Sequence, residues 1–188
     1  MKHVLYALLT AVSILFTSCG PSSNTNNPQV PNVPQPQPQP QPEVTQKVVI
    51  GYLALDDWEF ESLFPTIEWK YLTHINASFA RVKADGTLNI NPVRKRIESV
   101  RETAHKHNVK ILISLAKNSP GEFTTAINDP KARKELIQQI IAFTKEYKLD
   151  GFDIDYEEYD NWDKNFPSLL VFARGLYLAK EKNMLMTC

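Results

Sequence analysis

The sequence predicts an α/β fold whose parallel sheet forms part of a TIM-type (β/α)8 barrel. From residue 47 onward, short apolar runs alternate with amphipathic segments, the pattern of parallel strands joined by helical crossovers. No glycine-rich nucleotide-binding turn follows the first apolar run, which counts against an open, doubly wound sheet. A complete barrel needs about 250 residues, whereas the whole chain has 188. We therefore expect a barrel truncated after about four βα units and the start of a further strand.

The expected strands are short runs rich in apolar and β-branched residues, as in a sheet covered on both faces. They lie at 48–53, 72–79, 109–115, 152–156 and 184–186. Cys188, just beyond the last of them, is expected to be buried.

Three amphipathic helices are expected between these strands. Asn91-Pro92 and Asp129-Pro130 each place a capping residue before a proline, which is a common start of a helix. A third helix follows a loop around Trp162. Apolar residues at helical spacing mark the three buried faces: Val93, Ile97, Val100 and Ala104; Leu136, Ile137, Ile140, Phe143 and Tyr147; Leu169, Leu170, Phe172, Ala173 and Leu176.

Residues 1–19 are predicted to be a lipoprotein signal peptide. Lys2 and His3 precede an apolar stretch at 4–16, which is too short to span a bilayer and has the length of a signal-peptide core. The run Phe-Thr-Ser-Cys ending at Cys19 resembles the bacterial lipobox, whose cysteine becomes the lipidated first residue. We expect an exported protein held at the bacterial cell envelope, on the outer membrane or cell surface, by lipid on Cys19. Ordinary secretion is the alternative.

Residues 20–46 are predicted to be a disordered linker, which leaves 47–188 as the folded domain. The linker is rich in proline, glutamine, asparagine and serine, and such a segment forms an extended polyproline-II spacer of about 3 Å per residue. The chain has 21 Lys and Arg against 21 Asp and Glu, without a basic cluster. We therefore expect no nucleic acid as a partner.

An acidic cluster lies on the fourth expected strand. Because side chains alternate along a strand, Asp153, Asp155 and Glu157 should point to one face, which in a barrel is the interior. Glu157 would lie at the carboxyl end, where active sites of such barrels form. Neighbouring carboxylates in a partly dry interior disfavour one another's charge, so at least one should hold a proton near neutral pH. This arrangement favours acid-catalysed cleavage of a sugar acetal.

The acidic cluster also carries a resemblance to a known family. Asp150, Asp153, Asp155 and Glu157 match the D-x-x-D-x-D-x-E signature of glycoside hydrolase family 18, the chitinases and endo-β-N-acetylglucosaminidases. Further segments that resemble this family are Gly51-Tyr52, Leu72-Thr73-His74-Ile75-Asn76 and Lys110-Ile111-Leu112-Ile113-Ser114. The chain is therefore identified as the first half of a chitinase-like catalytic domain.

The resemblance implies a role for each acid. Glu157 would protonate the glycosidic oxygen and later activate water, and Asp155 would hold the 2-acetamido group of the sugar. Asp153 would share a proton with Asp155, while Asp150 would be mainly structural. The substrate-binding candidates are Tyr52 and Ser114, expected to hydrogen-bond near Asp153, together with Phe79, Tyr159 and Trp162.

One segment departs from the family pattern. The third strand of the family ends in Ser-x-Gly-Gly, whereas this chain has Ser114-Leu115-Ala116-Lys117. Glu158, Asp160 and Asp163, which follow the acidic cluster, are expected to form a solvated loop rim. A calcium loop of the EF-hand kind is not favoured, because the segment alternates as a strand and lacks the required glycine. His105 and His107 are two residues apart on a helix and do not face one ligand, so we expect no metal or cofactor.

The leading function is hydrolysis of β-1,4-linked N-acetylglucosamine, as in chitin or chitooligosaccharides, by a retaining, substrate-assisted mechanism. The alternative within the family is an endo-β-N-acetylglucosaminidase on the chitobiose core of N-glycans, because Tyr156 stands where many chitinases have tryptophan. An alternative of another class is a surface lipoprotein that binds glycans without cleaving them. The truncated chain by itself is expected to be inactive, since the missing strands would complete the site.

Overall fold

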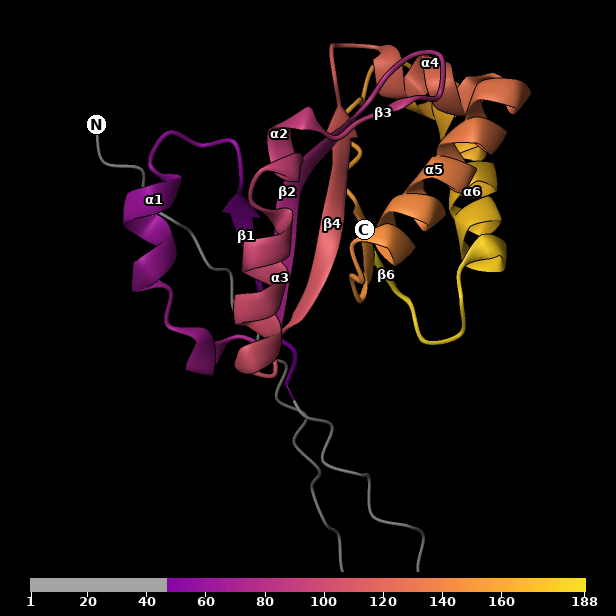
Figure 1. Cartoon of the computed structure of the whole chain (residues 1–188). Helices are drawn as coiled ribbons and strands as arrows, with labels where there is room; N and C mark the ends of the chain where they lie inside the picture. Colours follow the sequence, from indigo (N-terminus) through magenta and orange to yellow (C-terminus); the bar gives the residue numbers. More distant parts are fainter. Residues whose placement is uncertain (1–46) are drawn as a thin grey trace, which may run out of the picture. The chain divides into compact units, whose positions relative to one another are not determined.

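A largely parallel sheet is the centre of the fold in this computed structural model, which describes residues 47–188 (Figure 1). The predicted signal peptide, the lipidation of Cys19 and the predicted linker lie outside the described residues. The strands run in the order β1 (Ile50–Ala54), β2 (His74–Val82), β4 (Lys110–Lys117), β5 (Gly151–Ile154) and β6 (Leu185–Thr187), all paired in parallel. The α/β class and the parallel sheet are confirmed, while closure into a barrel stays a prediction.

Helical segments connect the strands. In chain order they are α1 (Phe60–Leu63), the 3-10 turns η1 (Phe64–Thr66) and η2 (Trp69–Tyr71), α2 (Asn91–Arg94), α3 (Ile97–Lys106), α4 (Glu122–Asn128), α5 (Pro130–Glu146) and α6 (Trp162–Ala179). Figure 1 shows α2 beside β2 and α5 beside α6, and α3 contacts β4. None of the helices within residues 47–188 is both long and apolar enough to cross a bilayer.

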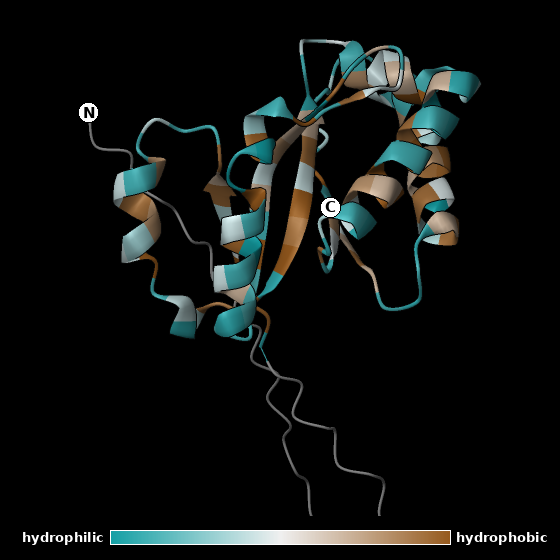
Figure 2. Cartoon of the chain, in the orientation of Figure 1, coloured by the Kyte–Doolittle hydropathy of each residue, from teal (hydrophilic) through white to brown (hydrophobic). Residues whose placement is uncertain are grey.

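The two faces of the sheet differ in polarity. One face carries Ile75, Ile113 and Phe152, which belong to the hydrophobic core together with helix residues such as Val100 and Leu136. Figure 2 shows hydrophobic residues along β4 and hydrophilic ones on the outer turns of the helices. The opposite face of the sheet carries two polar sets, each in register: Tyr52 with Asn76, and Ser114 with Asp153 and Thr187. On β4 the register partner of Asn76 is Leu112, two residues before Ser114. Strand alternation therefore separates a core face from a polar face.

Capping explains where the longest connecting helix before β5 begins. Asp129 is the N-cap of α5, and its carboxylate accepts a hydrogen bond of 2.7 Å from the backbone N–H of Ala132. Pro130 occupies the first turn, where its missing N–H costs nothing. This start was predicted from the sequence and is confirmed.

The helix predicted to start after Asn91 is divided in two. Asn91 is not its cap but lies inside α2, and the side-chain oxygen of Asn89 accepts the Asn91 N–H instead. The break before α3 falls at Arg96, whose guanidinium donates to the carbonyl oxygens of Leu55 and Asp57. Arg96 thereby ties the start of α3 to the loop after β1, a contact that helical spacing alone does not reveal.

Several short features differ from the sequence prediction. A two-residue strand, β3 (Leu88–Asn89), pairs antiparallel with β2 and was not predicted; α4 was not predicted either. The strand predicted at 152–156 ends at Ile154, and Trp162 begins α6 instead of lying in a loop. Cys188 is exposed because it lies beyond the last residue of β6, so its predicted burial is wrong.

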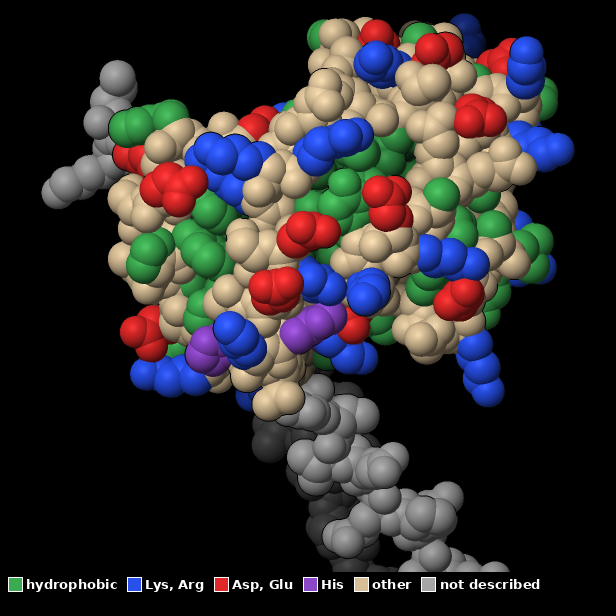
Figure 3. Space-filling model, viewed as in Figure 1, with side chains coloured by type: hydrophobic (Ala, Val, Ile, Leu, Met, Phe, Trp, Pro, Cys, Tyr) green, Lys and Arg blue, Asp and Glu red, His purple; other side chains and the backbone are tan. Residues whose placement is uncertain are grey.

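Charged groups of both signs are mixed on the visible surface. On the face shown in Figure 3, lysine and arginine side chains alternate with aspartate and glutamate, and hydrophobic side chains lie between them. Mixed charge of this kind creates no strong field of one sign over that face.

Candidate active site

The predicted acids follow one another from the sheet into the loop after β5. Asp153 lies on β5 and is 2% exposed, Asp155 is half-buried just beyond the strand, and Glu157 is exposed. The Asp155 N–H still bonds the Leu115 carbonyl at 3.0 Å, which is the last sheet-like contact before the chain turns away. The strand is therefore shorter than predicted, and Glu157 stands above the carboxyl edge of the sheet.

The carboxylate of Asp153 is surrounded by hydroxyl donors from three other strands. Tyr52 on β1 and Ser114 on β4 donate to its Oδ2 atom at 2.9 and 2.7 Å. Thr187 on β6 donates to Oδ1 at 2.6 Å. Hydrogen bonds to a charged acceptor are short and strong, so these donors compensate the burial of Asp153. The contacts of Tyr52 and Ser114 lie where the sequence placed them, whereas Thr187 was not identified.

Tyr52 is held in its donating form. Tyr52 is 59% exposed, but its partial burial and the neighbouring Asp153 raise its pKa to about 12. Its hydroxyl is therefore protonated at neutral pH and can donate to Asp153. This contact joins β1, the first strand in the order of the sheet, to β5, which carries Asp153.

Asp155 is the acid for which the environment favours a proton. Burial raises its pKa, and the negative charges of Glu157 and Asp153 raise it further. Lys117 and Arg81 act in the opposite direction because positive charge favours the carboxylate. Two acids and two bases thus lie near enough to Asp155 to influence its charge.

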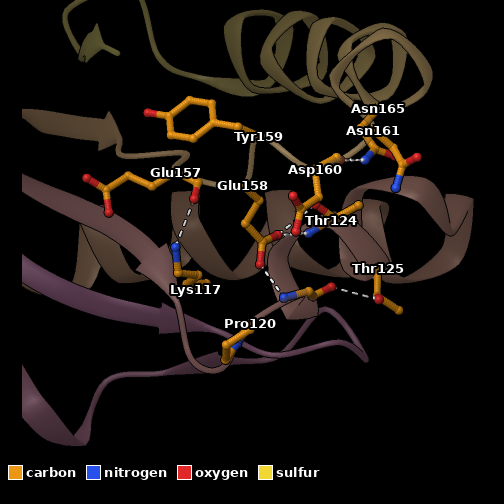
Figure 4. Close-up of a pocket in the computed structure, with 11 residues that line it drawn as sticks. Lys117, Pro120, Thr124, Thr125, Glu157, Glu158, Tyr159, Asp160, Asn161 and Asn165 are labelled. Atoms are coloured by element: carbon orange, nitrogen blue, oxygen red, sulfur yellow. Dashed lines mark hydrogen bonds between the residues drawn. The ribbon is translucent and has the colours of Figure 1, made fainter.

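Glu157 presents its side chain freely. Within residues 47–188 its carboxylate has no hydrogen-bond partner, and Figure 4 shows it extending away from the side chain of Glu158. The backbone of Glu157, in contrast, is held by Lys117 Nζ, which donates to its carbonyl oxygen at 2.9 Å. A free carboxyl on an anchored backbone can reach a ligand without losing its position.

Glu158 was expected to belong to a solvated rim, and that expectation is wrong. Its carboxylate accepts hydrogen bonds from the N–H of Gly121 and from the N–H and hydroxyl of Thr124, the latter two at 2.6 and 2.7 Å. The Thr124 hydroxyl also lies 2.6 Å from that of Tyr156. The partners are 32 to 37 residues apart in sequence, so no local signal could have revealed them.

A hollow of about 520 Å³ lies beside this loop (Figure 4). Its lining comes from the ends of β4 and β5 and the starts of α4 and α6: Lys117, Pro120, Gly121, Thr124, Thr125, Glu157, Glu158, Tyr159, Asp160, Asn161 and Asn165. Polar side chains, amides and an aromatic ring thus gather next to Glu157, a set suited to a polyhydroxylated ligand.

Asp150 lies at the opposite end of β5. Its Oδ2 atom accepts the Ile111 N–H at 2.8 Å and lies 2.8 Å from His105 Nε2. These contacts join β5, β4 and α3 far from Glu157, in keeping with a structural position. Within residues 47–188, no group of three or more His, Cys, Asp or Glu side chains is placed to share a metal ion.

The aromatic candidates fall in different surroundings. Phe79 is half-buried beneath the guanidinium of Arg81, 4.9 Å from its ring centroid. Tyr159 is 70% exposed in the loop, and its ring lies 6.2 Å from that of Trp162. Trp162 also contacts Tyr156 and Phe166, so it belongs to an aromatic cluster at the start of α6. Trp69 is buried in the hydrophobic core.

Comparisons with known proteins agree with one another. The family model described as glycosyl hydrolases family 18 matches residues 48–188. The crystal structure of a chitinase from Bacteroides thetaiotaomicron is 99% identical, with a TM-score of 0.76, over 77% of this chain and 46% of that chain. A chitinase structure from Rhizomucor miehei, 19% identical over 73% of this chain and 46% of that chain, shares the fold with a TM-score of 0.60.

Two curated proteins also resemble part of the chain. Chitinase B of Serratia marcescens is 26% identical over 144 residues, which are 60% of this chain and 28% of that protein. A chitinase-like effector of Moniliophthora roreri is 28% identical over 95 residues, or 48% of this chain and 23% of that protein. The chain spans less than a third of each of these relatives and less than half of the Bacteroides chitinase chain.

Proposed function

Because the chain belongs to glycosyl hydrolase family 18, we propose that it acts in the hydrolysis of β-1,4-linked N-acetylglucosamine, with Glu157 as the acid and base. The observation that carries this proposal is the graded burial of the acids. Asp153 is enclosed, Asp155 is half-buried with a raised pKa, and Glu157 is exposed at the carboxyl edge of the sheet. Chemistry on a large polymer requires a reachable acid beside groups that stay inside the protein.

Each acid has a distinct task in this proposal. Glu157 protonates the glycosidic oxygen while the acetamido carbonyl oxygen of the sugar attacks the anomeric carbon. Asp155 binds the acetamido N–H and stabilises the positive oxazolinium ion that forms. Glu157 then takes a proton from water, which opens the ring with retention of configuration. Asp153, fixed by its hydroxyl donors, supplies negative charge next to Asp155.

The alternatives gain no support from the geometry. The endo-β-N-acetylglucosaminidase hypothesis depended on Tyr156, but this ring packs edge-on against Phe123 on the helix side of the loop. The Tyr156 hydroxyl is hydrogen-bonded with Thr124, so having tyrosine instead of tryptophan at this position says little about which sugar is bound. A glycan-binding protein without catalysis would not need an acid such as Glu157 beside a proton-favouring Asp155.

The substrate is tested with two glycans. Chitin oligosaccharides and a high-mannose glycopeptide are offered to the chain and, in parallel, to the longer Bacteroides chitinase that is 99% identical over the matched region. We expect the longer chitinase to cleave the oligosaccharides with retention of anomeric configuration, observed by NMR during the first turnovers, and the chain alone to be inactive. Cleavage of the glycopeptide alone would refute the chitin substrate, and tight binding without cleavage would support the non-catalytic alternative.

We also propose that the protein is exported and anchored by lipid on Cys19. The apolar segment and lipobox-like run at the start of the sequence support this localisation. Radiolabelled palmitate should enter the protein in a bacterial host, and Cys19→Ala should abolish the label and release the protein from the membrane fraction. Equal labelling of the variant would contradict the anchor.

A further inference from the structure

The backbone that carries Glu157 is held from two sides by charged side chains. On one side, Lys117 at the end of β4 donates from Nζ to the Glu157 carbonyl oxygen at 2.9 Å. On the other, the neighbouring Glu158 binds the segment that leads into α4 through Gly121 and Thr124. Figure 4 shows these contacts below and beside the loop, whereas the Glu157 side chain points elsewhere.

The contacts of Lys117 and Glu158 hold the chain beyond the last pairing of β4 and β5. Pairing between β4 and β5 ends at Leu115 and Ile154, and a single further backbone bond reaches Asp155. Beyond that point no strand ladder fixes the chain, and the exposed Glu157 side chain does not fix itself. Tyr156 packs against Phe123 on one side of Glu157, and the remaining contacts that hold the acid's backbone segment are those of Lys117 and Glu158.

The Lys117 contact is not part of the family pattern that identified the chain. The strand that ends in Ser-x-Gly-Gly in the family ends here in Ser114-Leu115-Ala116-Lys117. A glycine has no side chain that could reach the next loop, so this chain fixes the acid by a contact that the usual motif cannot make. The same ammonium group lowers the pKa of Asp155, which opposes the effect of burial.

We propose that Lys117 and Glu158 are positioning residues that together fix the backbone segment carrying Glu157. This inference rests on the proposed function for its consequence in catalysis, but the geometric part stands separately. Correct placement of a catalytic group matters because a displacement of about 1 Å can cost on the order of a hundredfold in rate.

The experiment compares matched substitutions in the chain and at the equivalent positions of the longer Bacteroides chitinase. Lys117→Met removes the donor, Lys117→Arg restores one, and Glu158→Gln removes the charge while keeping the shape. Lys95→Met and Glu146→Gln are controls, since both residues are exposed, Lys95 in the turn between α2 and α3 and Glu146 at the end of α5. The kinetic readouts, taken on the longer chitinase, are kcat and KM on chitin oligosaccharides and the pH profile of kcat/KM. Amide hydrogen exchange of residues 155–160 is followed in both proteins.

We expect Lys117→Met and Glu158→Gln to lower kcat by between about tenfold and about a hundredfold with little change in KM. Exchange should accelerate in residues 155–160 and stay unchanged in β4 and α5. Lys117→Met should also move the acid limb of the pH profile upward, because loss of a cation raises the pKa of Asp155. Lys117→Arg should recover most of the rate, and the controls should match the wild type.

The outcomes separate the two proposals. Absence of glycan cleavage by both wild-type proteins would refute the proposed function. Amide hydrogen exchange of residues 155–160 in the variants would still test whether Lys117 and Glu158 position the loop. Unchanged kcat with unchanged exchange would overturn the positioning. Accelerated exchange throughout the sheet, without a local effect, would also overturn it, because Lys117 and Glu158 would then support the fold in general.

Discussion

Replacing Glu157 by glutamine separates chemistry from folding more cleanly than any other change at this site. Glutamine keeps the shape of the side chain but cannot donate or accept the reacting proton. Since the carboxylate of Glu157 is exposed and bonds no other group within residues 47–188, its loss removes no contact of the folded protein. We therefore expect a large effect on turnover and almost none on stability.

The magnitudes follow from these surroundings. A positioned general acid contributes about 10² to 10⁴ in rate, which corresponds to about 2.7 to 5.4 kcal/mol of activation free energy. An exposed substitution without broken contacts changes the free energy of unfolding by less than about 0.5 kcal/mol. Glu157→Gln should therefore lower kcat far more than it changes the melting temperature or the affinity for an oligosaccharide.

The assay uses two leaving groups in the longer Bacteroides chitinase, with Glu146→Gln as the matched control. A chitin oligosaccharide needs protonation of its leaving oxygen, whereas a nitrophenyl glycoside has a leaving group that departs largely without it. The loss caused by Glu157→Gln should therefore be greater on the oligosaccharide than on the nitrophenyl glycoside. An undiminished rate, or an equal loss on both substrates with weakened binding, would refute the assignment of Glu157 as the acid.

Further predictions concern the residues around this acid. The melting temperature of Asp155→Asn should be higher than that of the wild type at about pH 7 but not at about pH 3. Burial and the neighbouring acids raise the pKa of Asp155, so its stabilising contribution is complete below the ordinary aspartate pKa and is lost as the pH rises through the raised one. Ser114→Ala should cost about 1.5 to 3 kcal/mol, because it removes a fully buried hydrogen bond to the charged Asp153. Gly151→Ala should lower the free energy of unfolding by about 1 to 3 kcal/mol, since the added Cβ would lie 2.1 Å from the carbonyl oxygen of Leu185.

All of these stability changes are measured by thermal and urea unfolding of residues 47–188 or of the longer chitinase. Ser119→Ala and Asp56→Asn are controls, because both residues are exposed. A lower melting temperature of Asp155→Asn near about pH 7 would contradict the raised pKa. A neutral Ser114→Ala or Gly151→Ala would contradict the close contacts at β5.

Local sequence patterns sufficed to predict the parts of the fold that depend on one segment at a time. Apolar runs located the parallel strands within a few residues, and Asp129-Pro130 located the start of α5 because the cap and the proline act within a single turn. Alternation along β5 placed Asp153 on the polar face. These features are encoded by neighbours in the chain, so the sequence is enough to find them.

Features that depend on two distant segments were missed. Thr187 meets Asp153 only after β6 has paired with β5, and Glu158 meets Gly121 only after α4 has packed beside the loop. The predicted strand was too long because alternation continued in the sequence after pairing had stopped at Ile154. Pattern describes what a segment can do, whereas tertiary contacts decide where it ends.

The environment of Asp153 links the chemistry of the site to the completeness of the sheet. A buried carboxylate is costly unless donors compensate it, and here the donors Tyr52, Ser114 and Thr187 come from β1, β4 and β6. Asp153 can therefore keep its charge in the interior only when these strands are assembled around β5. Since the charge of Asp153 helps to raise the pKa of Asp155, the proton-favouring environment forms together with the sheet and not before it. The site is thus a property of the assembled strands, although its acids are adjacent in sequence.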